Sequence, residues 1–298
     1  MTSIYSIGEF EYKAPGSLHE ALHILAEAGA GAMVLAGGTD LTLQMKCRQI
    51  QPSLVVDVKR IPELNYLNWS EDEGLRLGAA VPLSKLLTFK KLTEKFNILA
   101  QACSVIGSMQ IKNRATVGGN ICNAAPSADS ALPLLCLGAS AMLASDSGTR
   151  TILLEDFFIA PGKTAMNNNE LLVEITVPTP PVRAAGCYQR HTTREEMDIA
   201  VAGAASYIVL SPQDETLQEV RIALGAVAPT PIRARRAEAV LTGKTATPDI
   251  IEEAAAKAAE EAHPISDLRG SANYRRELVK VLTRRTLKKS CADLGIKA

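Results

Sequence analysis

The sequence is poor in aromatic residues, has no excess charge of either sign and contains no long apolar run. Aromatic side chains make up 4% of its 298 residues, and 32 lysines and arginines balance 32 aspartates and glutamates. A zero net charge without a basic cluster argues against nucleic acid or an anionic membrane as the main partner. The longest uncharged apolar stretch, 131–144, is interrupted by Pro133 and is too short to span a bilayer. We therefore expect no nucleic-acid partner and no membrane span.

The six cysteines are scattered, and their spacing fits neither a disulfide framework nor a zinc or iron–sulfur site. The first residues, MTSIYSIGEFEYK, also lack the basic and apolar regions of a signal peptide. These absences predict a cytoplasmic protein with reduced thiols. Cys122 lies inside a glycine-rich run, where we expect it to be a small packing residue and not a reactive nucleophile.

A hydrophobic content of 47% is typical of a globular protein, and the length corresponds to about two domains. Pro178, Pro180 and Pro181 form the clearest linker. Before the linker, Ser17 and Glu20 form a capping box for a helix that ends at Gly29. The remaining pattern predicts α+β architecture in both halves. The expected elements are strands at 33–36, 54–58, 75–78, 151–154, 171–177, 199–210 and 220–227, and helices at 92–105, 234–241, 248–262 and 274–292.

Two glycine pairs, at 36–40 (AGGTD) and 116–120 (TVGGN), stand out. A phosphate binds where backbone N–H groups converge on it, which favours residues without a Cβ and with freedom to adopt positive φ. Threonine hydroxyls can add donors, and Asp or Asn side chains suit the hydroxyls of a sugar or ribityl chain. One glycine pair alone is more often a simple tight turn. Two pairs of matching composition favour a ligand that carries phosphate.

Other motifs fail on context. Gly29-Ala30-Gly31 lacks the third glycine of a dinucleotide-binding fingerprint, and the Gly-Lys-Thr runs at 162–164 and 243–245 lack the upstream glycine of a P-loop. The run 19–23 matches the H-E-x-x-H motif of zinc proteases. Its glutamate belongs to the capping box, however, and no third ligand has a familiar spacing. We interpret both histidines as solvent-facing residues and expect no metal site.

The two glycine segments and their surroundings resemble the FAD-binding medium subunit of the molybdenum hydroxylases, the group of xanthine dehydrogenase, aldehyde oxidase and molybdenum carbon monoxide dehydrogenase. The resemblance covers nearly the full length. Within the group, ICN-x-APSADSA and APTPIRA are most similar to the bacterial xanthine dehydrogenase branch. The segments that carry the resemblance are AGGTD (36–40), IGSMQIKNRATVGGNICNAAPSADSALPLL (106–135), PGKT (161–164), NELLVEITVP (169–178), REEMDIA (194–200) and ALGAVAPTPIRARRAE (223–238).

The resemblance implies an α+β chain of two domains. The first is a two-lobed FAD-binding domain of the vanillyl-alcohol-oxidase (PCMH) type at 1–179, with lobes at about 1–58 and 59–179. The second is a smaller α+β domain of the CO-dehydrogenase-flavoprotein type at 183–292. It is expected to have a three- to four-stranded antiparallel sheet and helices.

The resemblance also implies one non-covalent FAD and no catalytic acid or base on this chain. Ile106 replaces an aromatic residue that animal relatives place against the adenine, and Met197 replaces an acidic residue near the isoalloxazine. Because of Met197, the resemblance does not decide whether the electron acceptor is NAD+ or another oxidant. The implied FAD contacts are Val34, Leu35, Ala36, Gly37, Gly38, Thr39, Asp40, Leu41, Ile106, Thr116, Val117, Gly118, Gly119, Asn120, Asp129, Leu172 and Arg190, the last at the position of a family lysine.

The function implied is electron transfer within a xanthine dehydrogenase-like complex. A large partner subunit would hold the molybdenum cofactor, and a small partner subunit would hold two [2Fe–2S] clusters. FAD on this chain would collect electrons and pass them on. The family indicates a heterotrimer as the repeating unit. A flavin-binding protein without turnover, acting in assembly or as a binding module, remains the alternative, and a zinc hydrolase is the least favoured one.

Overall fold

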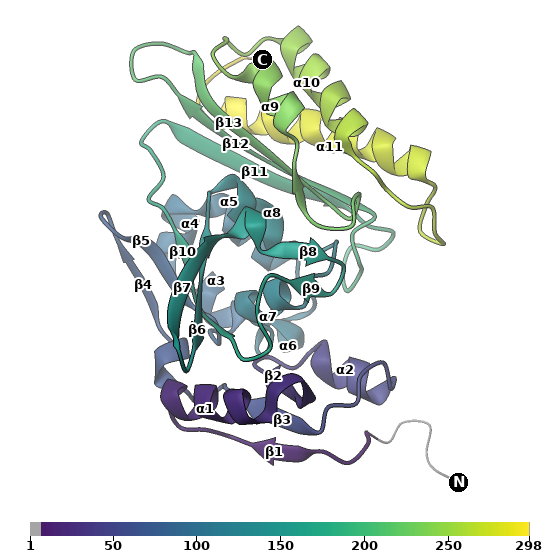
Figure 1. Ribbon diagram of the computed structural model, residues 1–298. Helices are drawn as coiled ribbons and strands as arrows, with labels where there is room; N and C mark the ends of the chain where they lie inside the picture. The colour runs from purple at the N-terminus through teal and green to yellow at the C-terminus, as the bar shows by residue number, and fades with distance from the viewer. Residues whose placement is uncertain (1–6, 298) are drawn as a thin grey trace.

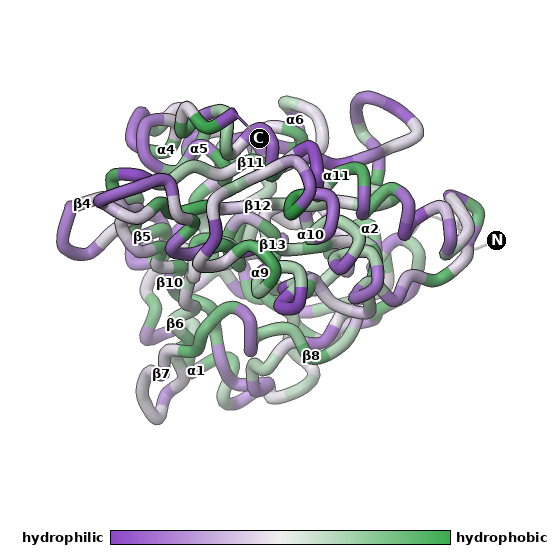
Figure 2. Tube along the Cα trace, turned by 90° about the horizontal axis from the view of Figure 1, so that it is seen from above, coloured by the Kyte–Doolittle hydropathy of each residue, from purple (hydrophilic) through white to green (hydrophobic). Residues whose placement is uncertain are grey.

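The computed structural model describes residues 7–297. Figure 1 shows an N-terminal lobe, a middle lobe and a C-terminal sheet covered by helices, stacked in that order along the molecule. Viewed along this stack, hydrophobic segments concentrate in the sheets and hydrophilic ones in the peripheral loops (Figure 2). Residues 1–6, which the predicted first lobe includes, lie outside the described part.

The N-terminal lobe is a small parallel sheet with helix α1 (Leu18–Ala28) against it. The sheet has the order β1 (Glu11–Lys13), β3 (Leu54–Asp57), β2 (Ala32–Leu35). Ser17 caps α1 by accepting a hydrogen bond from the Glu20 N–H at 3.2 Å, and Gly29 ends it with a φ of +55°. Both histidines of the H-E-x-x-H run are exposed. Within residues 7–297, no group of histidine, cysteine and acidic side chains could hold a metal ion.

The middle lobe is built on a five-stranded antiparallel sheet in the order β4-β5-β10-β6-β7. Its strands are β4 (Leu67–Ser70), β5 (Gly74–Gly78), β10 (Leu171–Val177), β6 (Ser140–Ser145) and β7 (Gly148–Leu153), with a small hairpin of β8 (Phe158–Ala160) and β9 (Lys163–Thr164). Its helices are α3 (Leu83–Leu87), α4 (Lys90–Lys95), α5 (Asn97–Ser104), α6 (Met109–Lys112), α7 (Val117–Cys122) and α8 (Ala131–Cys136), and α2 (Leu41–Lys46) leads in from the first lobe.

The single helix predicted over 92–105 is wrong. The structure divides this stretch into α4 and α5 at Phe96, whose backbone has a φ of −124° and a ψ of 40°. Phe96 is 1% exposed and belongs to the core of the middle lobe. Its apolar side chain continues the hydrophobic periodicity, which is why the sequence pattern did not reveal the break.

The C-terminal domain is a four-stranded antiparallel sheet in the order β11-β12-β13-β14, as expected for this part of the chain. Its strands are β11 (Ala184–His191), β12 (Ala202–Leu210), β13 (Leu217–Gly225) and β14 (Ile232–Arg233), and its helices are α9 (Arg235–Leu241), α10 (Pro248–Glu261) and α11 (Ala272–Asp293). The helices cover one face of the sheet (Figure 1). The other face packs against α5 and α8, so every residue of β12 is buried.

Strand β11 is absent from the sequence-based expectations. Its sequence, AAGCYQRH, includes glycine and polar residues and shows no clear alternation of apolar and polar positions. The structure gives the reason. Tyr188 and Arg190 point toward the middle lobe, where their polar groups have buried partners.

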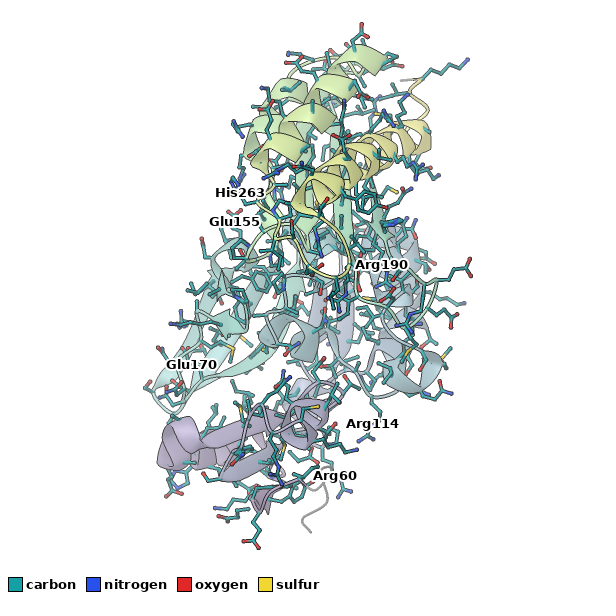
Figure 3. All side chains as sticks on the ribbon, turned by 90° about the vertical axis from the view of Figure 1, so that its right-hand side faces the viewer. Arg60, Arg114, Glu155, Glu170, Arg190 and His263 are labelled. Carbon is teal, nitrogen blue, oxygen red and sulfur yellow. The ribbon has the colours of Figure 1, made fainter. Side chains whose placement is uncertain are left out.

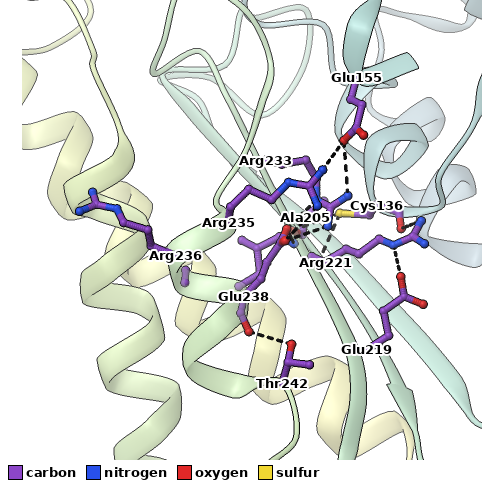
Figure 4. Close-up of polar contacts among 12 residues, drawn as sticks. Cys136, Glu155, Ala205, Glu219, Arg221, Arg233, Arg235, Arg236, Glu238 and Thr242 are labelled. Carbon is purple, nitrogen blue, oxygen red and sulfur yellow. Dashed lines mark hydrogen bonds and ion pairs between the residues drawn. The ribbon is translucent and has the colours of Figure 1, made fainter. Parts of the chain in front are cut away.

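A polar network also joins the two domains (Figure 4). Glu155, just after β7, contacts the guanidinium of Arg235 at 2.6 Å and that of Arg233 at 3.9 Å. Glu238 binds Arg233 through two contacts, at 2.5 and 2.8 Å. Glu238 also accepts a hydrogen bond from the Ile222 N–H at 2.8 Å. The contacts of Glu155 attach the C-terminal domain to the middle lobe at the side of the proline linker, and Glu238 holds Arg233 in place within the C-terminal domain.

Candidate functional site

The two glycine segments that the sequence singles out lie against each other. A Cβ on Gly37 would lie 2.4 Å from the carbonyl oxygen of Arg114 and 2.7 Å from the Cα of Ala115. Backbone therefore contacts backbone, and no side chain fits between. The Gln44 amide on α2 adds a hydrogen bond to Asn123 at 3.1 Å. Figure 3 shows Arg114 at this junction between the N-terminal and middle lobes.

The glycine pair at 116–120 does not form a tight turn, the commoner structure of a single glycine pair, but lies at the start of α7. Thr116 is the N-cap, and its Oγ1 accepts a hydrogen bond from the Gly119 N–H at 2.8 Å. The N–H groups of the first helical turn have no intrahelical acceptor, and the helix dipole places partial positive charge there. A helix start of this kind can bind an anion such as a pyrophosphate.

The remaining three glycines have different structural requirements. Gly38 has a φ of +76°, a conformation that side chains disfavour, and its Cβ would lie 2.5 Å from Leu35 Cδ1. A Cβ on Gly118 would lie 2.6 Å from the Ala79 carbonyl oxygen, so its absence allows close backbone approach. A Cβ on Gly119 would have a single neighbouring atom within 4 Å, Thr116 Oγ1, at a distance of 3.1 Å. Gly119 is thus the glycine of these segments that borders otherwise open space.

Asp129 and Arg190 form a buried ion pair between the two domains. Asp129 precedes α8, Arg190 lies on β11, and Arg190 Nη1 is 2.7 Å from Asp129 Oδ2. Their side chains are 11% and 7% exposed. The Tyr188 hydroxyl donates to the other carboxylate oxygen, and Arg190 Nη2 donates to the Val105 carbonyl at 2.8 Å. Figure 3 places Arg190 where the C-terminal domain meets the middle lobe.

Three further implied site residues, Asn120, Ile106 and Leu172, differ in their surroundings. The Asn120 carbonyl Oδ1 accepts a hydrogen bond from Ser130 at 2.6 Å, next to Asp129 in the sequence. Ile106 is half-buried and directly follows Val105. Leu172, by contrast, is 2% exposed and lies within the hydrophobic core on β10.

The segment 34–41 runs from the end of β2 through the glycine turn to the first residue of α2. Its side chains are half-buried except that of Asp40, which is exposed.

Met197 is 51% exposed on the loop between β11 and β12, and its φ is +54°. Asp198 organises this loop by accepting hydrogen bonds from Thr193 Oγ1 at 2.6 Å and the Arg194 N–H at 3.0 Å.

Burial shifts the pKa values of two titratable groups near the glycine segments, Asp129 and Cys122. Burial raises the pKa of Asp129, whereas the Arg190 charge and the Tyr188 hydroxyl act to lower it. Burial also raises the pKa of Cys122 to about 12, and its Sγ lies 3.8 Å from the sulfur of Met166. A raised pKa disfavours the reactive thiolate, in line with the prediction that Cys122 is a packing residue.

Sequence reasoning missed the side chains that support these groups, chiefly Tyr188, Gln44 and Asn123. The signal for Tyr188 is its spacing of two residues from Arg190, because alternate residues of a strand share a face. That signal is readable only once β11 is recognised as a strand. No sequence feature predicts the contact between Gln44 and Asn123.

A crevice of about 430 Å³ lies elsewhere, between the proline linker and the C-terminal sheet. The guanidinium groups that line it are those of Arg221, Arg233 and Arg235. Each of them is already paired with a carboxylate, as Figure 4 shows. This crevice therefore offers no uncompensated charge for an anionic ligand.

Comparison with known proteins identifies the relatives of this chain. The family described as FAD binding domain in molybdopterin dehydrogenase matches residues 8–180, and the family described as CO dehydrogenase flavoprotein C-terminal domain matches residues 187–290. The chain belongs to the FAD-binding medium subunits of the molybdenum hydroxylases. It is an oxidoreductase subunit with the fold that the resemblance implied.

Three relatives illustrate the breadth of this family. The glyceraldehyde dehydrogenase medium chain of Sulfolobus acidocaldarius is 35% identical over 94% of this chain and 98% of its own length. The putative xanthine dehydrogenase FAD-binding subunit of Escherichia coli is 32% identical over 95% and 97%, respectively. A chain of carbon monoxide dehydrogenase from Hydrogenophaga pseudoflava has a TM-score of 0.93 at 34% identity, covering 96% of this chain and 99% of that one. The xanthine dehydrogenase branch is therefore not distinguished from the others by identity.

The described residues include no helix that is both long and apolar enough to cross a membrane.

Proposed function

We propose that this chain binds one FAD non-covalently and acts as the electron-transfer subunit of a three-subunit molybdenum hydroxylase. The observation that carries the proposal is the contact between the two glycine segments. It brings the backbone of Arg114 and Ala115, just before α7, against Gly37. In our proposal, the start of α7, the space beside Gly119 and the turn at Gly38 together hold the phosphates. The chemistry of this donor set suits a pyrophosphate.

The proposed FAD contacts are residues 34–41 and 116–120 together with Ile106, Asp129, Leu172 and Arg190. The polar groups fit the cofactor. The Asp129 carboxylate has two protein donors, and a carboxylate can accept more, so it can still accept a hydroxyl of the ribityl chain. We assign the FAD-binding domain to 1–179, with lobes at about 1–58 and 59–179, and the C-terminal domain to 183–292.

Bound FAD would supply the ability to take up electrons singly and release them as a pair. The residues of this chain bind and orient the cofactor. The α7 N–H groups and Thr116 hold phosphate, Asp129 holds a hydroxyl, and Arg190 supplies positive charge that Asp129 compensates. None of these residues needs to transfer a proton.

The proposed partners are a large subunit with the molybdenum cofactor and a small subunit with two [2Fe–2S] clusters. The names of the relatives, as medium chains or FAD-binding subunits, support this division of labour. We propose NAD+ or another oxidant as the acceptor and the cytoplasm as the location. Xanthine-like substrates are the finer proposal, supported by the APSADSA and APTPIRA motifs, although the glyceraldehyde and carbon monoxide relatives are equally similar.

The test is purification of this chain with its co-expressed partners. Acid precipitation should release yellow FAD into the supernatant, and reduction of the complex by its substrate should bleach the flavin. Flavin that stays with the pellet would refute non-covalent binding. A yellow protein that never turns over with any partner would favour the alternative of a binding or assembly role. Comparing aldehydes, carbon monoxide and purines as reductants identifies the substrate class.

A further inference from the structure

Tyr188 is a buried tyrosine outside the implied set of FAD contacts, yet it is bonded to one of them. It is 6% exposed, and its hydroxyl donates a hydrogen bond to Oδ1 of Asp129. Arg190, two residues further along β11, binds Oδ2 of the same carboxylate at 2.7 Å. Because alternate residues of a strand share a face, both donors approach Asp129 from the same strand face.

Both donors are themselves fixed to the end of α5. The Tyr188 backbone N–H donates to Gln101 Oε1 at 2.8 Å. Arg190 donates through Nη2 to the carbonyl oxygen of Val105, the C-cap of α5, at 2.8 Å. The orientation of the Asp129 carboxylate is therefore set by two anchored groups of the other domain.

The tyrosine hydroxyl also affects the charge of this pair. Burial opposes ionisation of Asp129, and Arg190 and Tyr188 counteract that effect. Loss of the tyrosine hydroxyl would favour the protonated carboxyl and leave the Arg190 charge uncompensated. An uncompensated cation beside a flavin stabilises its anionic reduced form and so raises the reduction potential.

We propose that Tyr188 is a positioning residue for the flavin, which holds Asp129 against Arg190 and thereby sets both the affinity for FAD and the reduction potential of the bound cofactor. The inference rests on the proposed function, since it takes Asp129 and Arg190 as residues next to FAD. It assigns to Tyr188 a role that acts through Asp129 and needs no contact between the tyrosine and the cofactor.

The test compares Tyr188→Phe with Tyr207→Phe in the full-length chain. Tyr207 lies on the neighbouring strand β12, is also 6% exposed, and its hydroxyl has no hydrogen-bond partner among residues 7–297. Tyr188→Phe should weaken FAD binding roughly tenfold, which corresponds to about 1.4 kcal/mol. It should also move the midpoint potential, measured against redox dyes, to a more positive value. Tyr207→Phe should change neither quantity.

A double-mutant cycle with Asp129→Asn distinguishes this role from a general packing effect. If Tyr188 acts through Asp129, the tyrosine substitution adds little to the FAD dissociation constant once Asp129 is changed. The inference would be overturned if Tyr188→Phe weakened FAD binding equally with Asp129 intact and with Asp129→Asn. It would also be overturned if Tyr188→Phe kept full flavin occupancy and the wild-type reduction potential. A wild-type chain that binds no FAD would instead refute the proposed function.

Discussion

Substitution of Gly119 separates cofactor binding from folding. A Cβ at this position meets only Thr116 Oγ1, at 3.1 Å, so Gly119→Ala requires a small shift of one hydroxyl. Replacing a helical glycine by alanine removes a destabilisation of roughly 0.5–1 kcal/mol, which offsets that contact. We therefore expect the free energy of unfolding of the FAD-free chain to stay within about 1 kcal/mol of the wild-type value.

FAD binding should respond differently, because the new side chain occupies the space assigned to the cofactor. Gly119→Ala should weaken binding at least about tenfold, or about 1.4 kcal/mol, and the larger Gly119→Val should weaken it further. Titration of the FAD-free chain, followed by quenching of flavin fluorescence, gives the dissociation constant. Urea unfolding, followed by the fluorescence of Trp69, the single tryptophan, gives the stability.

Gly118→Ala is the matched control one residue earlier. Its Cβ would lie 2.6 Å from the carbonyl oxygen and 2.9 Å from the Cα of Ala79, and backbone cannot yield as a side chain does. We expect a loss of stability of about 1–3 kcal/mol, as for other overpacked sites. The reasoning is refuted if Gly119→Val binds FAD as tightly as the wild type, or if Gly118→Ala leaves stability unchanged.

Two further predictions concern buried carboxylates. Glu238→Ala should reduce the free energy of unfolding, measured by urea denaturation, by about 3–5 kcal/mol. The substitution removes the close partner of the buried Arg233 guanidinium, which keeps only its 3.9 Å contact with Glu155, and it leaves the Ile222 N–H without its acceptor. Arg233→Met combined with Glu238→Leu should recover much of that loss. The Arg150 guanidinium lowers the pKa of Glu170 in the folded protein below the unfolded value of 4.5. The ionised carboxylate therefore stabilises the fold at pH values above 4.5. This contribution to the free energy of unfolding is lost as the pH falls through the lowered pKa of the folded state. Glu170→Gln should therefore flatten the pH dependence of unfolding below pH 4.5, and an unchanged slope would contradict this assignment.

Local signals in the sequence were sufficient for elements whose ends are marked by their own residues. The cap at Ser17 and the stop at Gly29 define α1, and the apolar run 171–177 is the central strand β10. The sequence failed where tertiary contacts override the local pattern. Phe96 continues a helical periodicity while its backbone leaves the helix, and β11 carries polar residues that are buried against another domain.

The candidate site was predictable as a set of residues but not as an arrangement. The glycine pairs could be read from the sequence, whereas the division of labour among their members required coordinates. Gly37 and Gly118 allow backbone contact, Gly38 allows positive φ, and Gly119 leaves open space. The pairing of Asp129 with Arg190 could not be foreseen either, because it joins positions 61 residues apart, one of them on an unpredicted strand.

Helix α8 explains how two domains can hold one site in a fixed geometry. All six of its residues are buried. Just before its start, Asp129 is bound to the C-terminal domain through Arg190. At its other end, the Cys136 carbonyl accepts a hydrogen bond from Arg221 of β13 at 3.3 Å. A short helix fixed at both ends cannot shift without breaking contacts to the C-terminal sheet, so the carboxylate beside the proposed flavin is placed by the packing of both domains together.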